Sequence, residues 1–180
     1  MPIKADLRGL QKLTRELVLQ GERGRKELQR ATIDMLRSAK PETNREIRKT
    51  YNVKVGPINQ RIKAQTVPNE FAITIGAKNE KTKIPASDFT GTRVTAKGVR
   101  VQLLKSGSPV IVPRSFRGSP KIKGRLVARV EDKRFPLRSI GGATAREMMF
   151  EKRGVLESVV NVVLVRASKA VAKRLLRLGG

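Results

Sequence analysis

The spacing of the apolar residues changes twice along this 180-residue chain, and that change constrains the fold more than any other feature. Four leucines between residues 7 and 17 recur every three or four positions, which is typical of an amphipathic helix. From about residue 66 to residue 140 the spacing is two, which is typical of strands. After residue 141 it returns to three or four. The pattern predicts an α+β fold with N-terminal helices, an antiparallel sheet of about four strands that carries a basic loop or arm, and a long C-terminal amphipathic helix.

A chain of this length suits one domain with a modest core. We therefore expect a single domain over residues 1–180. Its parts are a helical part at 1–64, an antiparallel sheet with a basic arm at 65–140, and a C-terminal helix at 141–180.

The N-terminal part is expected to hold two longer helices between residues 5 and 40. Gly21 and Gly24 are expected to separate them, and Pro41 is expected to end the second one, because proline disrupts a helix interior.

A compact unit is expected to follow over residues 43–63. Thr43-Asn-Arg-Glu46 has capping-box spacing and predicts a short helix to about Tyr51, and Gly56-Pro57 predicts the start of another. Such a pair could be a helix–turn–helix that binds DNA. Packing into a core is the favoured alternative, because the second helix has barely two turns. The apolar residues that would pack are Ile47, Val53, Ile58 and Ile62.

The middle part alternates apolar and other residues over several short runs. Residues 77–92 lie between two of these runs and are expected to be a loop or an extended arm. The expected strands lie at about 71–75, 99–103, 110–112, 126–130 and 135–140.

The C-terminal part begins with Gly141-Gly142, where the chain is expected to return to helix. Thr144-Ala-Arg-Glu147 is a second capping box, and the helix is expected to run toward Leu178 with a kink at Gly154. Its apolar stripe could contact another subunit or could pack on the sheet of the same chain. The candidate subunit-interface residues are Val160, Val163, Val171 and Leu175.

The charge is strongly unbalanced, with 40 Lys and Arg against 15 Asp and Glu, a net charge of +25. The interval between Asp88 and Glu131 holds ten bases and no acid, and part of it is the Gly/Pro/Ser-rich stretch 113–124. We interpret this stretch as a basic arm that lies on phosphates or on an acidic protein, the alternative being a solvated loop without a partner. The candidate residues for contact with a nucleic acid or an acidic partner are Arg93, Arg100, Arg114, Arg117, Lys121, Lys123, Arg125 and Arg129.

The chain has no histidine, cysteine or tryptophan. Thiol nucleophiles, Ser-His-Asp triads, disulfides and the usual zinc sites cannot be built without them. No phosphate-binding loop of the GxxxxGK[ST] type is present either. We expect no enzymatic activity, no cofactor, no metal and no small-molecule substrate. The charged start of the chain and the lack of a long apolar run predict neither export nor membrane insertion.

The order of several segments resembles a known family. A Tyr-Asn-Val segment leads to Ile-Asn-Gln-Arg-Ile-Lys at 51–63, GSPVIVPRSF follows at 107–116, and Arg-Phe-Pro-Leu at 134–137 precedes Gly141-Gly142 and a helix with Met148-Met149. Over roughly residues 5–178 this order resembles the minor tail protein Z family of lambda-like tailed phages, also described as tail-completion proteins. Gly142-Ala-Thr-Ala stands where members tend to have Gly-Pro-Ser-Val.

The resemblance implies a structural protein of the virion, located at the head-proximal end of the tail after assembly in the host cytoplasm. It implies a homo-oligomer, most simply a hexameric ring, that helps to join head and tail and to position the DNA end. The implied partners are the tail terminator, tail tube or neck proteins and, in one reading, the phage DNA end. The family has no catalytic residues to transfer.

Two other hypotheses remain open. A sequence-independent nucleic-acid-binding protein of ribosomal or nucleoid type would explain the charge, although aromatic residues that could stack on bases make up only 3% of the chain. A peripheral membrane protein would use the basic C-terminal helix, but its apolar face lacks Trp and Phe.

Overall fold

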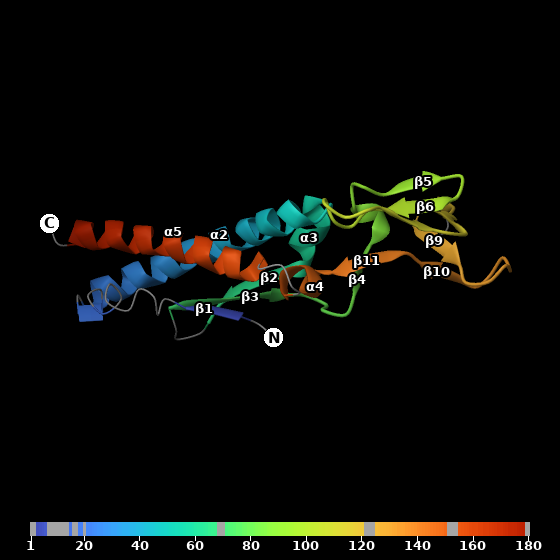
Figure 1. The fold of residues 1–180 in the computed structure, drawn as a ribbon. Helices are drawn as coiled ribbons and strands as arrows, with labels where there is room; N and C mark the ends of the chain where they lie inside the picture. The colour runs from blue at the N-terminus through green and yellow to red at the C-terminus, as the bar shows by residue number, and fades with distance from the viewer. Residues whose placement is uncertain are drawn as a thin grey trace.

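The computed structural model describes residues 3–6, 15, 18–19, 21–67, 71–120, 125–150 and 155–178. They form an elongated α+β molecule, with long helices at one end and short strands at the other (Figure 1). The predicted fold class is confirmed, including the C-terminal helix.

The described helices and strands are mostly short, apart from two long helices. The helices are α2 (Gly21–Thr50), α3 (Val55–Arg61), the 3-10 turn η2 (Ala86–Asp88), α4 (Ala145–Phe150) and α5 (Val155–Leu178). The strands are β1 (Ile3–Asp6), β2 (Ile62–Thr66), β3 (Ala72–Ala77), β4 (Lys83–Pro85), β5 (Arg93–Thr95), β6 (Gly98–Val101), β7 (Val110–Val112), β8 (Ser115–Arg117), β9 (Leu126–Arg129), β10 (Leu137–Ser139) and β11 (Gly141–Thr144).

The first part of the molecule, which we call the helical body, consists of α2 to α5 and the antiparallel sheet β1-β3-β2. Helices α2 and α5 lie side by side along its length (Figure 1). Arg174 near the end of α5 contacts Glu27 and Asp34 in the first half of α2, and the earlier Arg166 contacts the later Glu42, so the two helices run antiparallel. The largest apolar cluster of the molecule lies between these helices and the sheet.

Helix α2 is one 30-residue helix that continues through Pro41, so the prediction that Pro41 ends a helix is wrong. Proline removes the hydrogen bond to the carbonyl four residues earlier, that of Arg37. Pro41 and Arg37 are both exposed, so water can satisfy this carbonyl, while Ala39 and Ile47 are buried on the opposite face and hold the helix in place. The capping box expected at Thr43 is also wrong, because Thr43 lies inside α2 and its hydroxyl donates to the carbonyl of Ala39 at 2.7 Å.

The segment after α2 packs into the core rather than presenting a helix to solvent. The packing alternative is confirmed, because all four of the apolar residues expected there are buried in the main cluster: Ile47, Val53, Ile58 and Ile62. Helix α3 has seven residues, and its residue Ile58 is fully buried.

The other end of the molecule, which we call the β lobe, holds β5 to β10. Two three-stranded antiparallel sheets, β5-β6-β7 and β10-β9-β8, pack together, and β11 pairs with β4 at the base of the lobe. The single sheet of about four strands is therefore replaced by several small sheets. They share a second apolar cluster, to which Val99 and Val101 of β6 and Leu126 and Ala128 of β9 contribute.

The junction between the lobe and the last helices differs from the prediction in one respect. Gly141-Gly142 does not begin a helix but belongs to β11, and the helical turn starts at Ala145. The capping box at its start is confirmed. The Thr144 backbone N–H donates to Glu147 Oε2 at 2.6 Å, and the Glu147 N–H donates to Thr144 Oγ1 at 3.1 Å. The expected kink at Gly154 lies outside the described residues.

The apolar stripe of α5 packs within the chain, which corrects the candidate subunit interface. Val163 and Val171 are fully buried, Val171 in a small cluster with Leu28 and Ala31 of α2. Val160 is half-buried against the main cluster, and the side chain of Leu175 lies outside the described residues. The apolar face of α5 therefore packs within the chain, as one alternative predicted, but it packs mainly on α2 rather than on a sheet.

Candidate anionic-partner interface

Most of the bases predicted to contact an anionic partner lie on the β lobe. Arg93 is on β5, Arg100 on β6, Arg117 on β8 and Arg129 on β9. Arg114 lies in the turn before β8, and Arg125 directly precedes β9, whereas Lys121 and Lys123 lie outside the described residues.

The sheet register places Arg93 and Arg100 directly opposite each other on neighbouring strands, and both are exposed. Two like charges in this position repel each other, because cross-strand neighbours lie about 5 Å apart. Within the described part of the chain neither residue forms an ion pair with a carboxylate. An anion bound over this pair would relieve the repulsion.

Backbone hydrogen bonds hold the segments that carry the other described bases of the lobe. The Arg129 N–H donates to the carbonyl of Arg114 at 3.1 Å, and the Gly118 N–H donates to the carbonyl of Arg125 at 2.8 Å. Arg117 is paired with Leu126, so Arg117 and Arg125 point to opposite faces of the sheet. Arg114 contacts the carboxylate of Asp132 at 3.0 Å. This is the one predicted contact residue with a described acidic partner.

These bases do not form a single patch. Val99 and Val101 point into the cluster of the β lobe, so Arg100 between them points outward from the sheet β5-β6-β7. By the same alternation Arg129 points outward from the sheet β10-β9-β8, where its guanidinium lies 5.6 Å from the centre of the Phe116 ring. The two sheets pack together, so the basic residues cover two opposite outer faces of the lobe.

The stretch 113–124, which was expected to be a basic arm, is partly a strand. Ser115–Arg117 forms β8 against β9. The buried Ser115 hydroxyl accepts a hydrogen bond from the Val99 N–H at 2.6 Å and donates to the carbonyl of Val112. This hydroxyl fixes the start of β8 against β6, so Arg114 and Arg117 project from a folded edge.

A second basic site lies in the helical body, and sequence reasoning missed it. Residues near the end of α2 and in α3 line a pocket of about 450 Å³ together with Lys105. Arg45, Arg48 and Lys49 share one helix face because they are three and four positions apart. This spacing was visible in the sequence. Lys105 joins them only through the fold, since the Lys105 N–H donates to the carbonyl of Thr50 at 2.9 Å.

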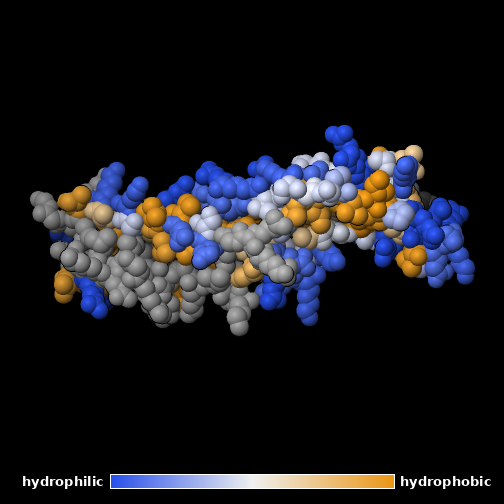
Figure 2. Space-filling view, in the orientation of Figure 1, coloured by the Kyte–Doolittle hydropathy of each residue, from blue (hydrophilic) through white to orange (hydrophobic). Residues whose placement is uncertain are grey.

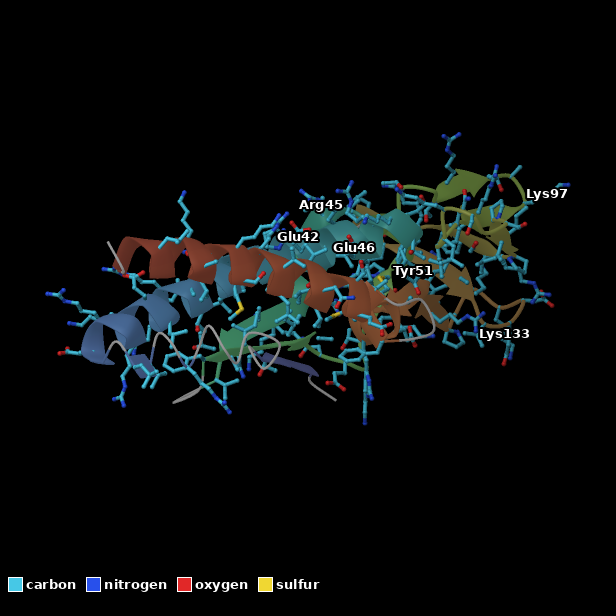
Figure 3. The ribbon with its side chains drawn as sticks, turned by 60° about the vertical axis from the view of Figure 1, so that its left-hand side comes forward. Glu42, Arg45, Glu46, Tyr51, Lys97 and Lys133 are labelled. Atoms are coloured by element: carbon cyan, nitrogen blue, oxygen red, sulfur yellow. The ribbon has the colours of Figure 1, made fainter. Side chains whose placement is uncertain are left out.

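Two of the four bases that line the pocket are paired with described carboxylates, and two are not. Lys49 and Arg45 contact buried carboxylates on the same helix, Glu46 at 2.6 Å and Glu42 at 3.2 Å (Figure 3). Arg48 and Lys105 have no described carboxylate within ion-pair distance. Asn44 and Asn59 also line the pocket, and Asn44 Nδ2 donates to Asn59 Oδ1 at 2.8 Å. The two cations of this pocket can bind a phosphate.

No group of three acidic side chains that could hold a metal ion occurs in the described part of the chain. Among the helices described here, none is long and apolar enough to cross a membrane. Comparisons of this chain with protein-family models, with curated proteins and with solved structures found no match.

Proposed function

We propose that the chain is a tail-completion subunit of a tailed bacteriophage, a minor tail protein that forms a ring at the head-proximal end of the tail. In that position it helps to join head and tail and to position the DNA end. The order of segments that resembles the tail protein Z family supports this assignment. The subunit acts by contact alone and has no catalytic role.

The observation that carries the proposal is the unbalanced charge of the β lobe. Arg93 and Arg100 lie opposite each other without a described carboxylate, on a chain with a net charge of +25. A subunit with this surface is best stabilised in an assembly where DNA or an acidic neighbour covers it. A ring in the neck of a phage provides both kinds of surface.

The direct test is complementation of a phage that lacks this gene. The deletion should leave filled heads and separate tails, and the chain supplied in trans should restore joined particles. Arg93→Glu with Arg100→Glu should fail to restore them. Arg23→Glu with Arg25→Glu is the matched control, because it makes the same change in charge at exposed positions at the start of α2. Normal joining with the lobe variant would contradict the role of the lobe, and normal particles without the gene would contradict the assignment.

A sequence-independent nucleic-acid-binding protein is the second candidate, favoured by the basic pocket lined by Arg48 and Lys105. Such a protein binds duplex DNA or structured RNA when purified. If six to ten phosphates are neutralised, affinity falls by about 10³–10⁵ between about 50 mM and 200 mM salt.

A band-shift titration at these two salt concentrations separates the two candidates. Tight binding of the purified chain with this steep salt dependence favours the second. Weak binding at both concentrations, together with restored head–tail joining, favours the tail protein.

A further inference from the structure

The β lobe exposes a loop that carries the apolar side chains of Val130 and Phe135, and it also contains an apolar pocket that this loop does not fill. The loop joins β9 to β10 over residues 130–136, and every residue in it is exposed. Phe135 has 65% of its surface exposed and Val130 has 50%. A phenylalanine this exposed loses a large hydrophobic contribution that burial would supply, since an aromatic side chain can bury about 150–250 Å².

The pocket lies at the base of the lobe, where the lobe meets the helical body. It has a volume of about 480 Å³ and is lined mainly by aliphatic side chains, among them Leu103, Leu104, Val110 and Ile140, with Tyr51 and Ser108 at its polar parts. Its volume lies within the range of about 300–1,000 Å³ that is common for binding pockets. Figure 2 shows apolar side chains gathered over this part of the molecule.

The loop and the pocket lie at opposite ends of the lobe. Figure 3 places Tyr51 at the base of the lobe and Lys133, a residue of the loop, at its outer end. The residues of the loop line no part of the pocket of their own chain. Contact between the two surfaces therefore needs two copies of the chain.

We propose that the β9–β10 loop of one copy docks in the apolar pocket of the next copy, head to tail, with Phe135 as the buried anchor. Such a heterologous contact closes into a ring when the rotation between copies allows it. This contact would join neighbouring subunits in the proposed ring. The closure of the ring rests on the proposed function, whereas the contact itself does not.

The charges of the two surfaces favour a second copy as the occupant. Glu131 and Asp132 balance Lys133 and Arg134, so the loop is neutral on a chain with a net charge of +25 and can approach another copy without strong repulsion. Lys105 directly follows Leu104, which lines the apolar pocket, and Lys105 has no described carboxylate within ion-pair distance. Asp132 is paired with Arg114 of its own chain, whereas Glu131 has no described cation within ion-pair distance. Glu131 lies four residues before Phe135, a span of about 13 Å in extended chain, so a docked loop can bring Glu131 to Lys105.

The docked area also predicts how strong the contact is. One loop and one pocket bury less than the 1,200–2,000 Å² typical of stable complexes. Val110 of the edge strand β7, which lines the pocket, is 64% exposed, so part of the docking surface lies open. We therefore expect weak association of the free chain that grows stronger when several contacts act in one assembly.

The chain has no cysteine, so the introduced thiols are the only ones that can cross-link. Lys133→Cys places a thiol in the loop, and Ser108→Cys places one at the exposed rim of the pocket. With a short bismaleimide, mixed full-length variants should cross-link about tenfold faster than a mixture of Lys133→Cys with Lys97→Cys, because docking raises the effective concentration of the thiols. Lys97 is the matched control, an exposed lysine at the outer end of the lobe (Figure 3).

Two further variants connect the cross-link to the proposed anchor. Phe135→Ser on the Lys133→Cys chain, or Val110→Arg on the Ser108→Cys chain, should reduce the rate to that of the control. Both residues are exposed, so the fold is kept. A rate equal to the control before these changes, or an unchanged rate after them, overturns the proposal.

The double variant Lys133→Cys/Ser108→Cys distinguishes the geometry. Head-to-tail docking gives a ladder of multimers, whereas reciprocal docking stops at a dimer and overturns the head-to-tail contact. If a small apolar dye binds in the pocket and no cross-link forms, the pocket is a ligand site and the proposal is overturned. If the chain forms a ladder but does not restore the joining of phage heads and tails, the contact stands and the proposed function is wrong. If the chain restores joining but forms no ladder, the proposed function stands and the contact is wrong.

Discussion

Gly142 lies so close to core side chains that only a glycine, whose side chain is a single hydrogen atom, fits there. A Cβ at this position would lie 2.4 Å from Cε2 of Phe89 and 2.9 Å from a methyl carbon of Leu103. Phe89 is almost fully buried, so its ring has little room to move. The close approach of β11 to this ring joins the base of the β lobe to the helical body.

Gly142→Ala is therefore expected to lower the free energy of unfolding by about 1–3 kcal/mol through overpacking. Gly76→Ala is the matched control, because a Cβ there meets no heavy atom within 4 Å. Urea titration followed by circular dichroism measures both. An equal effect of the two substitutions would contradict the packing argument.

At the scale of elements, a row of ion pairs connects α5 to α2. Arg174 has 20% of its side chain exposed and contacts Asp34 at 2.5 Å and Glu27 at 3.6 Å. Further along the pair of helices, Arg166 contacts Glu42 at 2.5 Å, and the side chain of Glu42 is 4% exposed. These contacts fix the register of two helices whose apolar stripes alone would allow sliding.

Replacement of Arg174 by leucine leaves two carboxylates without their shared cation. We expect the unfolding free energy to fall by about 1–3 kcal/mol, less than for a fully buried pair because Arg174 is partly exposed.

Arg37→Leu serves as the comparison, since Arg37 is 78% exposed and lies 3.9 Å from Asp34 on the same helix. It should change stability by about 0–0.5 kcal/mol. Hydrogen exchange of the α5 amides should increase in the Arg174 variant only, and equal exchange in the two variants would argue against the interhelical role.

At the scale of the whole molecule, the net charge of +25 repels itself within an elongated body (Figure 1). The helical body carries the basic pocket, and the two outer faces of the β lobe carry most of the remaining described candidate bases. The shape reduces the repulsion but does not remove it.

Added salt is accordingly expected to stabilise the free chain. Between about 0.01 M and 1 M sodium chloride the Debye length falls from about 30 Å to about 3 Å, which screens the repulsion between distant bases. The thermal midpoint should rise, and it should rise less in the variant Arg93→Ser/Arg100→Ser. A midpoint that falls with salt would mean that ion pairs such as Arg174–Asp34 outweigh the repulsion.

The sequence alone determined the features that depend on neighbouring residues. The spacing of apolar residues predicted the α+β class, the strand at 110–112 and the long C-terminal helix, and the Thr144–Glu147 capping box follows from contacts three residues apart. The lack of histidine and cysteine excluded whole classes of chemistry without any structure.

The tertiary structure decided whatever depends on residues far apart in the chain. Helix α2 continues through Pro41 because buried side chains on the opposite face hold the helix in place. Arg93 meets Arg100 through a strand register, and Lys105 reaches the bases of α2 through a hydrogen bond to Thr50. Local spacing cannot encode these meetings, because the free energy that fixes them comes from burial of side chains brought together from distant segments.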